Sequence, residues 1–247
     1  MFKALTKEQI AALESQGCQA EDWSRVQVAE GADACRIRGV RFTGDVRLGR
    51  MNGSVEGPDG IRRPAGISGA SLNNVSIGDN CFISNVQGWL SNLNIQDDVL
   101  IENVGSIVCT GSSTFGNGHE IAVLNEGGGR ELKITRLTSS QVAYLAVLYR
   151  DRKDLVARLN TMADQAARQM QSDRATVGSH ARVLRAGDIT NVWIGPAATI
   201  NGATSLHSGT IDSAQEDPVT VGPGVIAREF IFQRGSRVSD GAVVSAT

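Results

Sequence analysis

Residues 73–107 repeat with a period of 18, and this repeat constrains the fold more than any other feature of the sequence. Segment 74–86 aligns with segment 92–104, and Asn, Ile, Asp and Val return at matching positions. The repeat divides further by six, because large apolar residues recur at Ile77, Ile83, Trp89, Ile95, Ile101 and Ile107. A period of six grouped in threes predicts a hexapeptide β-helix.

Each hexad supplies one short strand and one corner. The first residue points inward, Gly, Asp or Asn tolerates the left-handed backbone of the corner, and the fifth residue is small and also points inward. Residues at this fifth position are Cys81, Val99, Ala198, Thr204 and Thr210. An antiparallel protein with alternating residues is the alternative, but alternation does not produce spacings of six and 18. We therefore expect an all-β solenoid, namely a parallel β-helix.

The pattern divides the chain into four parts. Residues 1–35 form an N-terminal helical cap, in which a helix over 6–17 begins with a capping box of Thr6 and Gln9. Residues 36–111 form the first β-helix block and residues 176–247 the second. Residues 112–175 break the pattern and predict an insertion, made of a β-hairpin over 120–135 followed by helices over 139–171.

Composition excludes several classes of protein. The 247 residues carry 24 basic and 26 acidic side chains without a clustered basic stripe, so we expect no nucleic-acid binding. No apolar run approaches the roughly 20 residues of a membrane span, and the N-terminus has no signal-peptide pattern, so we expect a cytoplasmic protein that binds no membrane. The four cysteines lack the CxxC spacing of redox or zinc motifs.

Several motifs carry a resemblance to a known family: Ala20-Glu21-Asp22-Trp23, Ile101-Glu102-Asn103-Val104-Gly105, 124–131 and 225–231. The chain resembles the N-terminal part of a bacterial family of unknown function, known mostly from Bacteroidetes. The hexads also resemble the trimeric hexapeptide-repeat (LpxA-like) superfamily, which implies a left-handed coil. Members of the bacterial family are usually longer, and the apolar pattern runs to Val244. We therefore expect the natural protein to continue beyond Thr247.

The superfamily resemblance implies an acyltransferase with a histidine general base. His119, at the start of the inserted hairpin beside Glu120, is our candidate, with Glu126 as a second catalytic residue. A solvated loop histidine is the simpler interpretation. His180 and His207 lie more than one coil apart in sequence and at different hexad positions, which argues against a three-histidine zinc site. We expect no metal.

The turn Glu126–Arg130 is the best local candidate for ligand binding. The backbone N–H groups of Gly127, Gly128 and Gly129 could cradle a phosphate, with Arg130 as its charge partner. A plain hairpin turn is the alternative. Elsewhere, Asn85 and Asn103 occupy the same position one coil apart, which predicts a stacked amide ladder in preference to a ligand groove.

Two functional hypotheses follow. The first is a transferase relative that uses acetyl-CoA or another acyl thioester, or binds a nucleotide sugar, in a groove between coil and insertion. The second is a non-catalytic scaffold or binding module of the β-helix class, present here as a fragment of a longer protein. A homo-oligomer is expected in either case, a trimer by analogy or a dimer through Leu145, Leu148 and Leu159 on the insertion.

Overall fold

The computed structural model describes residues 2–122, 129 and 131–246, and the chain is mostly β with three α-helices in these ranges. The helices are α1 (Lys7–Ser15), α2 (Ser140–Leu148) and α3 (Lys153–Met170), with short 3-10 turns η1 (Trp23–Arg25) and η2 (Ala34–Arg36). Strands before the insertion are β1 (Phe2–Ala4), β2 (Gln19–Ala20), β3 (Val26–Ala29), β4 (Ile37–Thr43), β5 (Val46–Leu48), β6 (Ser54–Glu56), β7 (Arg62–Pro64), β8 (Gly66–Ile77), β9 (Phe82–Val86), β10 (Trp89–Ile95), β11 (Leu100–Val104) and β12 (Ile107–Val108). The remaining strands are β13 (Glu120–Ala122), β14 (Glu131–Lys133), β15 (Ala175–Val177), β16 (Arg182–Leu184), β17 (Asp188–Ile194), β18 (Thr199–Asn201), β19 (Ser205–Ile211), β20 (Thr220–Val221), β21 (Ile226–Phe232), β22 (Arg237–Val238) and β23 (Val243–Ser245).

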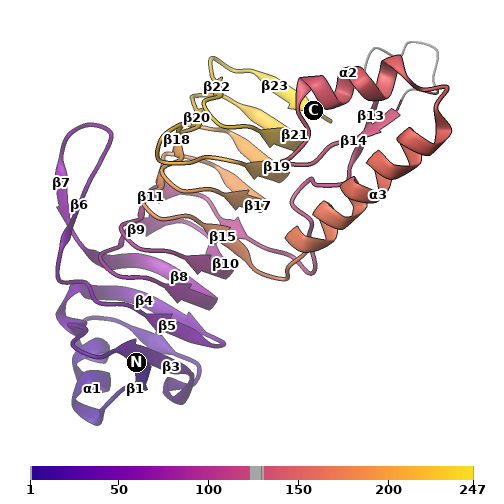
Figure 1. The fold of residues 1–247 in the computed structure, drawn as a ribbon. Coiled ribbons are helices and arrows are strands. Elements are labelled where there is room, and N and C mark those ends of the chain that lie inside the picture. Colours follow the sequence, from indigo (N-terminus) through magenta and orange to yellow (C-terminus); the bar gives the residue numbers. More distant parts are fainter. Residues whose placement is uncertain (1, 123–128, 130, 247) are drawn as a thin grey trace.

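Most of the described strands pair in parallel with strands one repeat away, in three ladders (Figure 1). We name the ladders by the buried residues that each stacks toward the core. Ladder I contains Ile67, Ile83, Ile101, Val183 and Ile200. Ladder II contains Leu72, Leu90, Ile107, Ile189 and Leu206. Ladder III contains Ile77, Ile95, Val177, Ile194 and Ile211. All of these side chains are buried in one hydrophobic cluster, which makes a closed aliphatic core.

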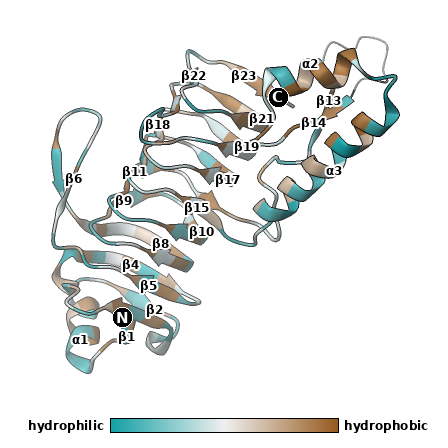
Figure 2. Cartoon of the chain, viewed as in Figure 1, coloured by the Kyte–Doolittle hydropathy of each residue, from teal (hydrophilic) through white to brown (hydrophobic). Residues whose placement is uncertain are grey.

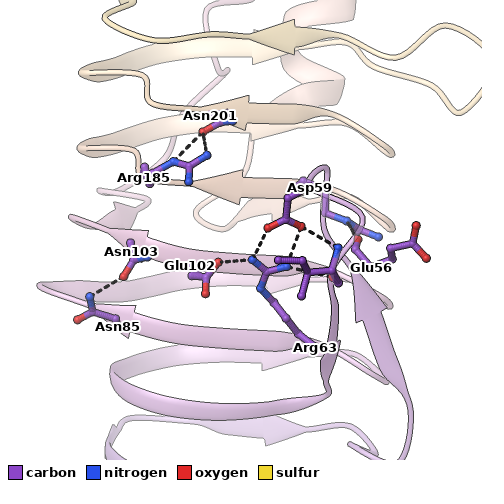
Figure 3. Close-up of polar contacts among 10 residues, drawn as sticks. Glu56, Asp59, Arg63, Asn85, Glu102, Asn103, Arg185 and Asn201 are labelled. Carbon is purple, nitrogen blue, oxygen red and sulfur yellow. Dashed lines mark hydrogen bonds and ion pairs between the residues drawn. The ribbon is translucent and has the colours of Figure 1, made fainter.

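The corners between ladders hold left-handed residues that bond to the next corner. Asn85 and Asn103 have φ values of 53° and 55°, and Asn85 Nδ2 donates to Asn103 Oδ1 at 2.7 Å (Figure 3). Asn74 Nδ2 donates likewise to Asn92 Oδ1 at 3.2 Å. The amide ladder predicted from the sequence is confirmed. Asn suits these corners because it tolerates positive φ and its side chain pairs with its neighbour.

The expectation that Trp89 points inward is wrong. Its side chain is 39% exposed, and its neighbour Leu90 takes the buried position in ladder II. The strand register shows that the coils differ in length. Leu90 pairs with Leu72, which lies 18 residues before it, and with Ile107, which lies 17 residues after it. The inward position therefore departs from a strict spacing of six.

A second error, at Thr204, has a different cause. This residue is exposed, whereas its neighbour Ala203 is buried. Ala203 lies three residues after Ile200 of ladder I, just as the buried Val104 lies three residues after Ile101. The inward residue at this corner is therefore the fourth of its hexad and not the fifth, in coils of either length.

The N-terminal cap follows its predicted local chemistry. Thr6 accepts a hydrogen bond from the backbone N–H of Gln9, whose side chain accepts one from the Thr6 N–H, so the capping box is present. Leu13 is the buried residue of α1 and joins the core beneath the first strands. No helix in the described part of the chain is long and apolar enough to cross a membrane.

The hairpin β6–β7 covers the outside of ladder I. Val55 packs in a small buried cluster with the outward-facing Leu100 and Leu184. Arg63 forms a bidentate pair with Asp59 at 2.8 and 3.0 Å and reaches Glu102 on β11 at 3.0 Å (Figure 3). The Arg63 side chain is only 14% exposed, so the hairpin is held against the ladder by both apolar and charged contacts.

Candidate functional site

The insertion leaves and re-enters the strand stack at one narrow neck. Ser113 and Ser172 exchange backbone hydrogen bonds of 2.8 and 2.9 Å, and we call residues 113–172 the arm. Within it, β13 and β14 form an antiparallel pair and α2 and α3 follow, standing to one side of the stack (Figure 1). Ladder I continues across the arm, because Ile101 pairs with Ile83 before it and with Val183 after it. The insertion therefore lengthens one coil without shifting the register.

The base of the arm is fixed to ladder III by buried polar groups. Thr210 is fully buried under the arm, and its hydroxyl donates to the Phe115 carbonyl at 2.6 Å and accepts from Asn117 Nδ2 at 3.0 Å. The expectation that Thr210 points into the coil is wrong, because Ile211 takes the inward position of ladder III and the arm covers its neighbour. Gly116 permits this close approach, since a Cβ there would lie 2.8 Å from the Ser208 carbonyl oxygen.

A second contact lies beside the first. Arg136 Nη2 lies 2.9 Å from Asp212 Oδ1, and the guanidinium carbon lies 5.3 Å from the centre of the Trp193 ring. The Asp212 side chain is only 9% exposed. The Arg136 side chain is 30% exposed, so loss of Arg136 would leave the buried Asp212 charge without compensation, and the pair stabilises the docked arm while both partners stay together. The two contacts together hold the arm base against ladder III.

His119 lies at this same base and pairs with an acid far away in sequence. His119 Nε2 lies 3.3 Å from Glu229 Oε2 on β21, and the two side chains are 33% and 49% exposed. The adjacent Glu120, which we considered as an acidic partner, is therefore not the acid that pairs with His119. The other two histidines lie elsewhere. His180 Nδ1 is 4.0 Å from Asp98 Oδ2, and His207 is exposed on β19.

A pocket of about 220 Å³ lies between the arm and the last strands. It is lined by Ile134, Thr135 and Thr138 of the arm and by Ile231, Gln233 and Ser236 of the stack. This pocket matches the predicted groove between coil and insertion. His119 is not among its lining residues, although its carbonyl accepts a hydrogen bond of 2.9 Å from the Ile134 N–H.

Most of the predicted glycine turn lies outside the described residues. These are Glu126, Gly127, Gly128 and Arg130. Gly129 is described, has a φ of 88°, and donates its N–H to Glu131 Oε1 at 2.9 Å. That N–H is therefore already engaged within the turn.

The cysteines offer no activated nucleophile among the described residues. Burial raises the pKa of Cys81 to about 12, and it also raises the pKa values of Cys18 and Cys109. Cys35 is exposed, but its hydrogen bond to Asp33 raises the pKa of its thiol as well. A reactive cysteine needs the opposite shift, because the thiolate is the nucleophile.

The sequence matches one family model over residues 2–247, that of the domain of unknown function DUF4954. This chain belongs to the DUF4954 family. It is 27% identical over 248 residues to a protein of Treponema pallidum (strain Nichols) that is named only "Uncharacterized protein". The match covers 96% of the DUF4954 chain but 34% of that relative, so the chain spans about a third of the relative's length. No solved structure matches it significantly.

Sequence reasoning missed most of the residues that hold the arm of the DUF4954 chain. Asn117 and Thr210 are 93 residues apart, and Arg136 and Asp212 come from similarly distant segments. The clearest available signal was the polar pair Asp212 and Ser213, which follows the end of β19 at Ile211, where the repeat is interrupted. That signal indicates a loop that interrupts the repeat, but it does not identify the arm residues that contact it.

Proposed function

We propose that this chain is a left-handed parallel β-helix of the hexapeptide-repeat class and acts as a rigid, non-catalytic scaffold that presents the arm to a second copy of itself. Support for the coil comes from the three ladders, their aliphatic inner rows and the left-handed Asn corners. The natural protein is longer than this chain, as the length of the Treponema relative suggests.

The observation that carries the scaffold proposal is the docking of the arm through fully buried polar groups. Thr210 has no exposed surface, and its hydroxyl joins two arm residues. Opening this contact would leave hydrogen-bonding groups unsatisfied, so the arm base is held closed. A fixed arm suits a protein that positions partners, whereas a catalytic lid must open in each turnover.

The outer surface of the arm suits a partner of the same kind. Helix α2 contains no charged residue, and Figure 2 colours it mostly brown, with Tyr144 62%, Leu145 45% and Leu148 52% exposed. The adjoining segment 150–154 carries both basic and acidic residues. Such a mixture lets two copies related by a two-fold axis pair acid with base around an apolar centre. Leu159 is half-buried and lines an open apolar pocket of the arm together with residues of β14, α2 and α3.

Sedimentation equilibrium tests the proposal. We expect a concentration-dependent dimer that Leu145→Glu with Leu148→Glu converts to a monomer. Ile61→Glu is the control, since Ile61 is 58% exposed on the hairpin β6–β7 and far from the arm. A wild-type chain that stays monomeric up to roughly millimolar concentration, where even weak contacts associate, would overturn the scaffold proposal.

A transferase is the second candidate, and the His119–Glu229 pair favours it. Glu229 would orient the imidazole, leaving Nδ1 to accept a proton from an acceptor hydroxyl or amine as it attacks an acyl thioester such as acetyl-CoA. A nucleotide sugar would be the acceptor. The assay is the release of coenzyme A thiol, detected with a chromogenic disulfide, for wild type, His119→Gln and Glu229→Gln. Turnover that disappears in His119→Gln and falls in Glu229→Gln would displace the scaffold proposal.

A further inference from the structure

A cleft rich in arginine lies on the outer face of ladder III, on the side of the neck away from the arm helices. Its volume is about 250 Å³, and its lining includes Arg25, Arg47, Arg174, Asp45 and Ser76. Four segments distant in sequence build it: the turn η1 with β3, strand β5 with its preceding turn, the end of β8, and the segment that re-enters the stack before β15. Arg174 joins the lining because the chain re-enters the stack at this point after the arm.

The charges in this cleft do not cancel. Arg25 Nε pairs with Asp45 Oδ1 at 2.9 Å, which accounts for one arginine and the one acid of the lining. Within the described chain, the guanidinium groups of Arg47 and Arg174 form neither a hydrogen bond nor an ion pair. Both nevertheless lie close enough to Asp45 to lower its pKa, after the larger effect of Arg25. Arg47 and Arg174 therefore bring two positive charges to the cleft that form no ion pair within the described chain.

The uncharged groups around these arginines are also hydrogen-bond donors. Gln27, Arg47 and Ser76 occupy one outward row of ladder III, because Gln27 pairs with Arg47 and Arg47 with Ser76 in the strand register. The Gln27 amide and the Ser76 hydroxyl make no side-chain hydrogen bond to any described residue. Arg174 approaches from the neck and is half-buried, with its backbone N–H bonded to Ser172 Oγ at 3.0 Å.

From this arrangement we propose that the cleft binds the phosphate group of a small phosphate ester, held by Arg47 and Arg174 with Ser76 and Gln27 as further donors. A phosphate dianion presents three terminal oxygens that match planar guanidinium donors and small polar groups. A monocarboxylate would neutralise only one of the two unpaired charges. The volume is below the range typical of drug-sized ligands, which suits a sugar phosphate better than a nucleotide.

Asp45 lowers the affinity of the site for an anion. Its carboxylate is 66% exposed and held by Arg25, while its backbone N–H is bonded to Asn74 Oδ1 at 3.0 Å. It is the one acidic residue among those that line the cleft, so it competes with an anionic ligand for Arg47 and Arg174. Asp45→Asn should therefore strengthen phosphate binding, whereas loss of an arginine should weaken it.

Isothermal titration of the full chain with glucose 6-phosphate tests the site, with inorganic phosphate, glucose and gluconate as comparison ligands. We expect saturable binding of glucose 6-phosphate that is weakened at least about tenfold in Arg47→Gln and in Arg174→Gln and strengthened in Asp45→Asn. Arg38→Gln is the matched control, because Arg38 is exposed on β4 in ladder I and makes no ion pair in the described chain. Added salt should weaken binding through screening.

Four results would overturn the proposal. Absence of saturable glucose 6-phosphate binding would refute the existence of the site. Equal weakening of binding by Arg38→Gln would show that the ligand is held only by general attraction to positive charge. Equal affinity for gluconate would remove the preference for phosphate. Tight binding of inorganic phosphate without binding of glucose 6-phosphate would refute the claim that the ligand is a phosphate ester. Circular dichroism of each variant checks that the fold is intact, and the oligomeric state tests the scaffold proposal separately.

Discussion

Replacing Thr210 by Val tests whether buried hydrogen bonds fix the arm. The substitution keeps the β-branched shape, so it changes the strand and the packing volume little. It removes one donor to the Phe115 carbonyl and one acceptor for Asn117 Nδ2, at a position with no exposed surface. Asn117 keeps a second bond of 2.9 Å to the Thr114 carbonyl, so the loss is partial. We expect the arm base to lose about 1–3 kcal/mol of stability.

Hydrogen exchange followed by mass spectrometry measures this loss locally. Amides of β14 and of the arm base should exchange roughly 5- to 150-fold faster in Thr210→Val, since about 1–3 kcal/mol corresponds to that range. Urea unfolding of the whole chain gives the global change. Thr190→Val is the control, because Thr190 lies one strand away on β17, is half-buried and makes no hydrogen bond through its side chain in the described chain. Exchange in the arm that is equal in the two variants would refute the role assigned to Thr210.

Three further predictions concern the stack itself. In the native protein a chromogenic disulfide should react rapidly with Cys35 alone of the four thiols, because the other three are buried. All four thiols should react in denaturant. Rapid reaction of a second thiol in the native protein would contradict the burial of the other three. Asn103→Ala should destabilise the chain by about 1 kcal/mol more than Asn103→Gly in urea unfolding, because φ is positive there and Ala carries a Cβ. An equal loss of unfolding free energy in the two variants would show that the side-chain hydrogen bond with Asn85, and not the positive φ, determines the effect. Arg63 lowers the pKa of Asp59 through their hydrogen bonds, so the pair stabilises the docked hairpin above pH of about 4 and loses this effect as the pH falls further. Limited proteolysis at the hairpin turn should accelerate on acidification in wild type but not in Asp59→Asn.

The repeat predicted much of the architecture because its signal is local. Inward aliphatic residues every sixth position appear as buried rows, for example Ile83 and Ile101 in ladder I. The helix cap at Thr6 and the Asn85–Asn103 bond also depend on residues one turn or one coil apart. Such features are fixed by short-range geometry, which a sequence displays directly.

The errors occur where geometry is set by contacts across the fold. Trp89 keeps a perfect spacing of six but is displaced from the core by Leu90, and the sequence alone shows no preference between two adjacent apolar residues. Thr210 is covered by an arm whose neck lies far earlier in the chain. His119 pairs with Glu229, which lies 110 residues later in the sequence, so no local pattern could identify the partner. The candidate site was therefore predicted only in its general place, between coil and insertion.

The unshifted register across the neck has a consequence for how such a chain can change. Strands on either side of the arm pair as if the insertion had never been added. The ladder pairing depends on the two ends of an inserted segment, which lie beside each other at the neck, and not on the length of the segment. Appendages can therefore be gained, exchanged or lost at such a neck while the ladder pairing is kept, so the surface and the stack of one polypeptide can evolve at different rates.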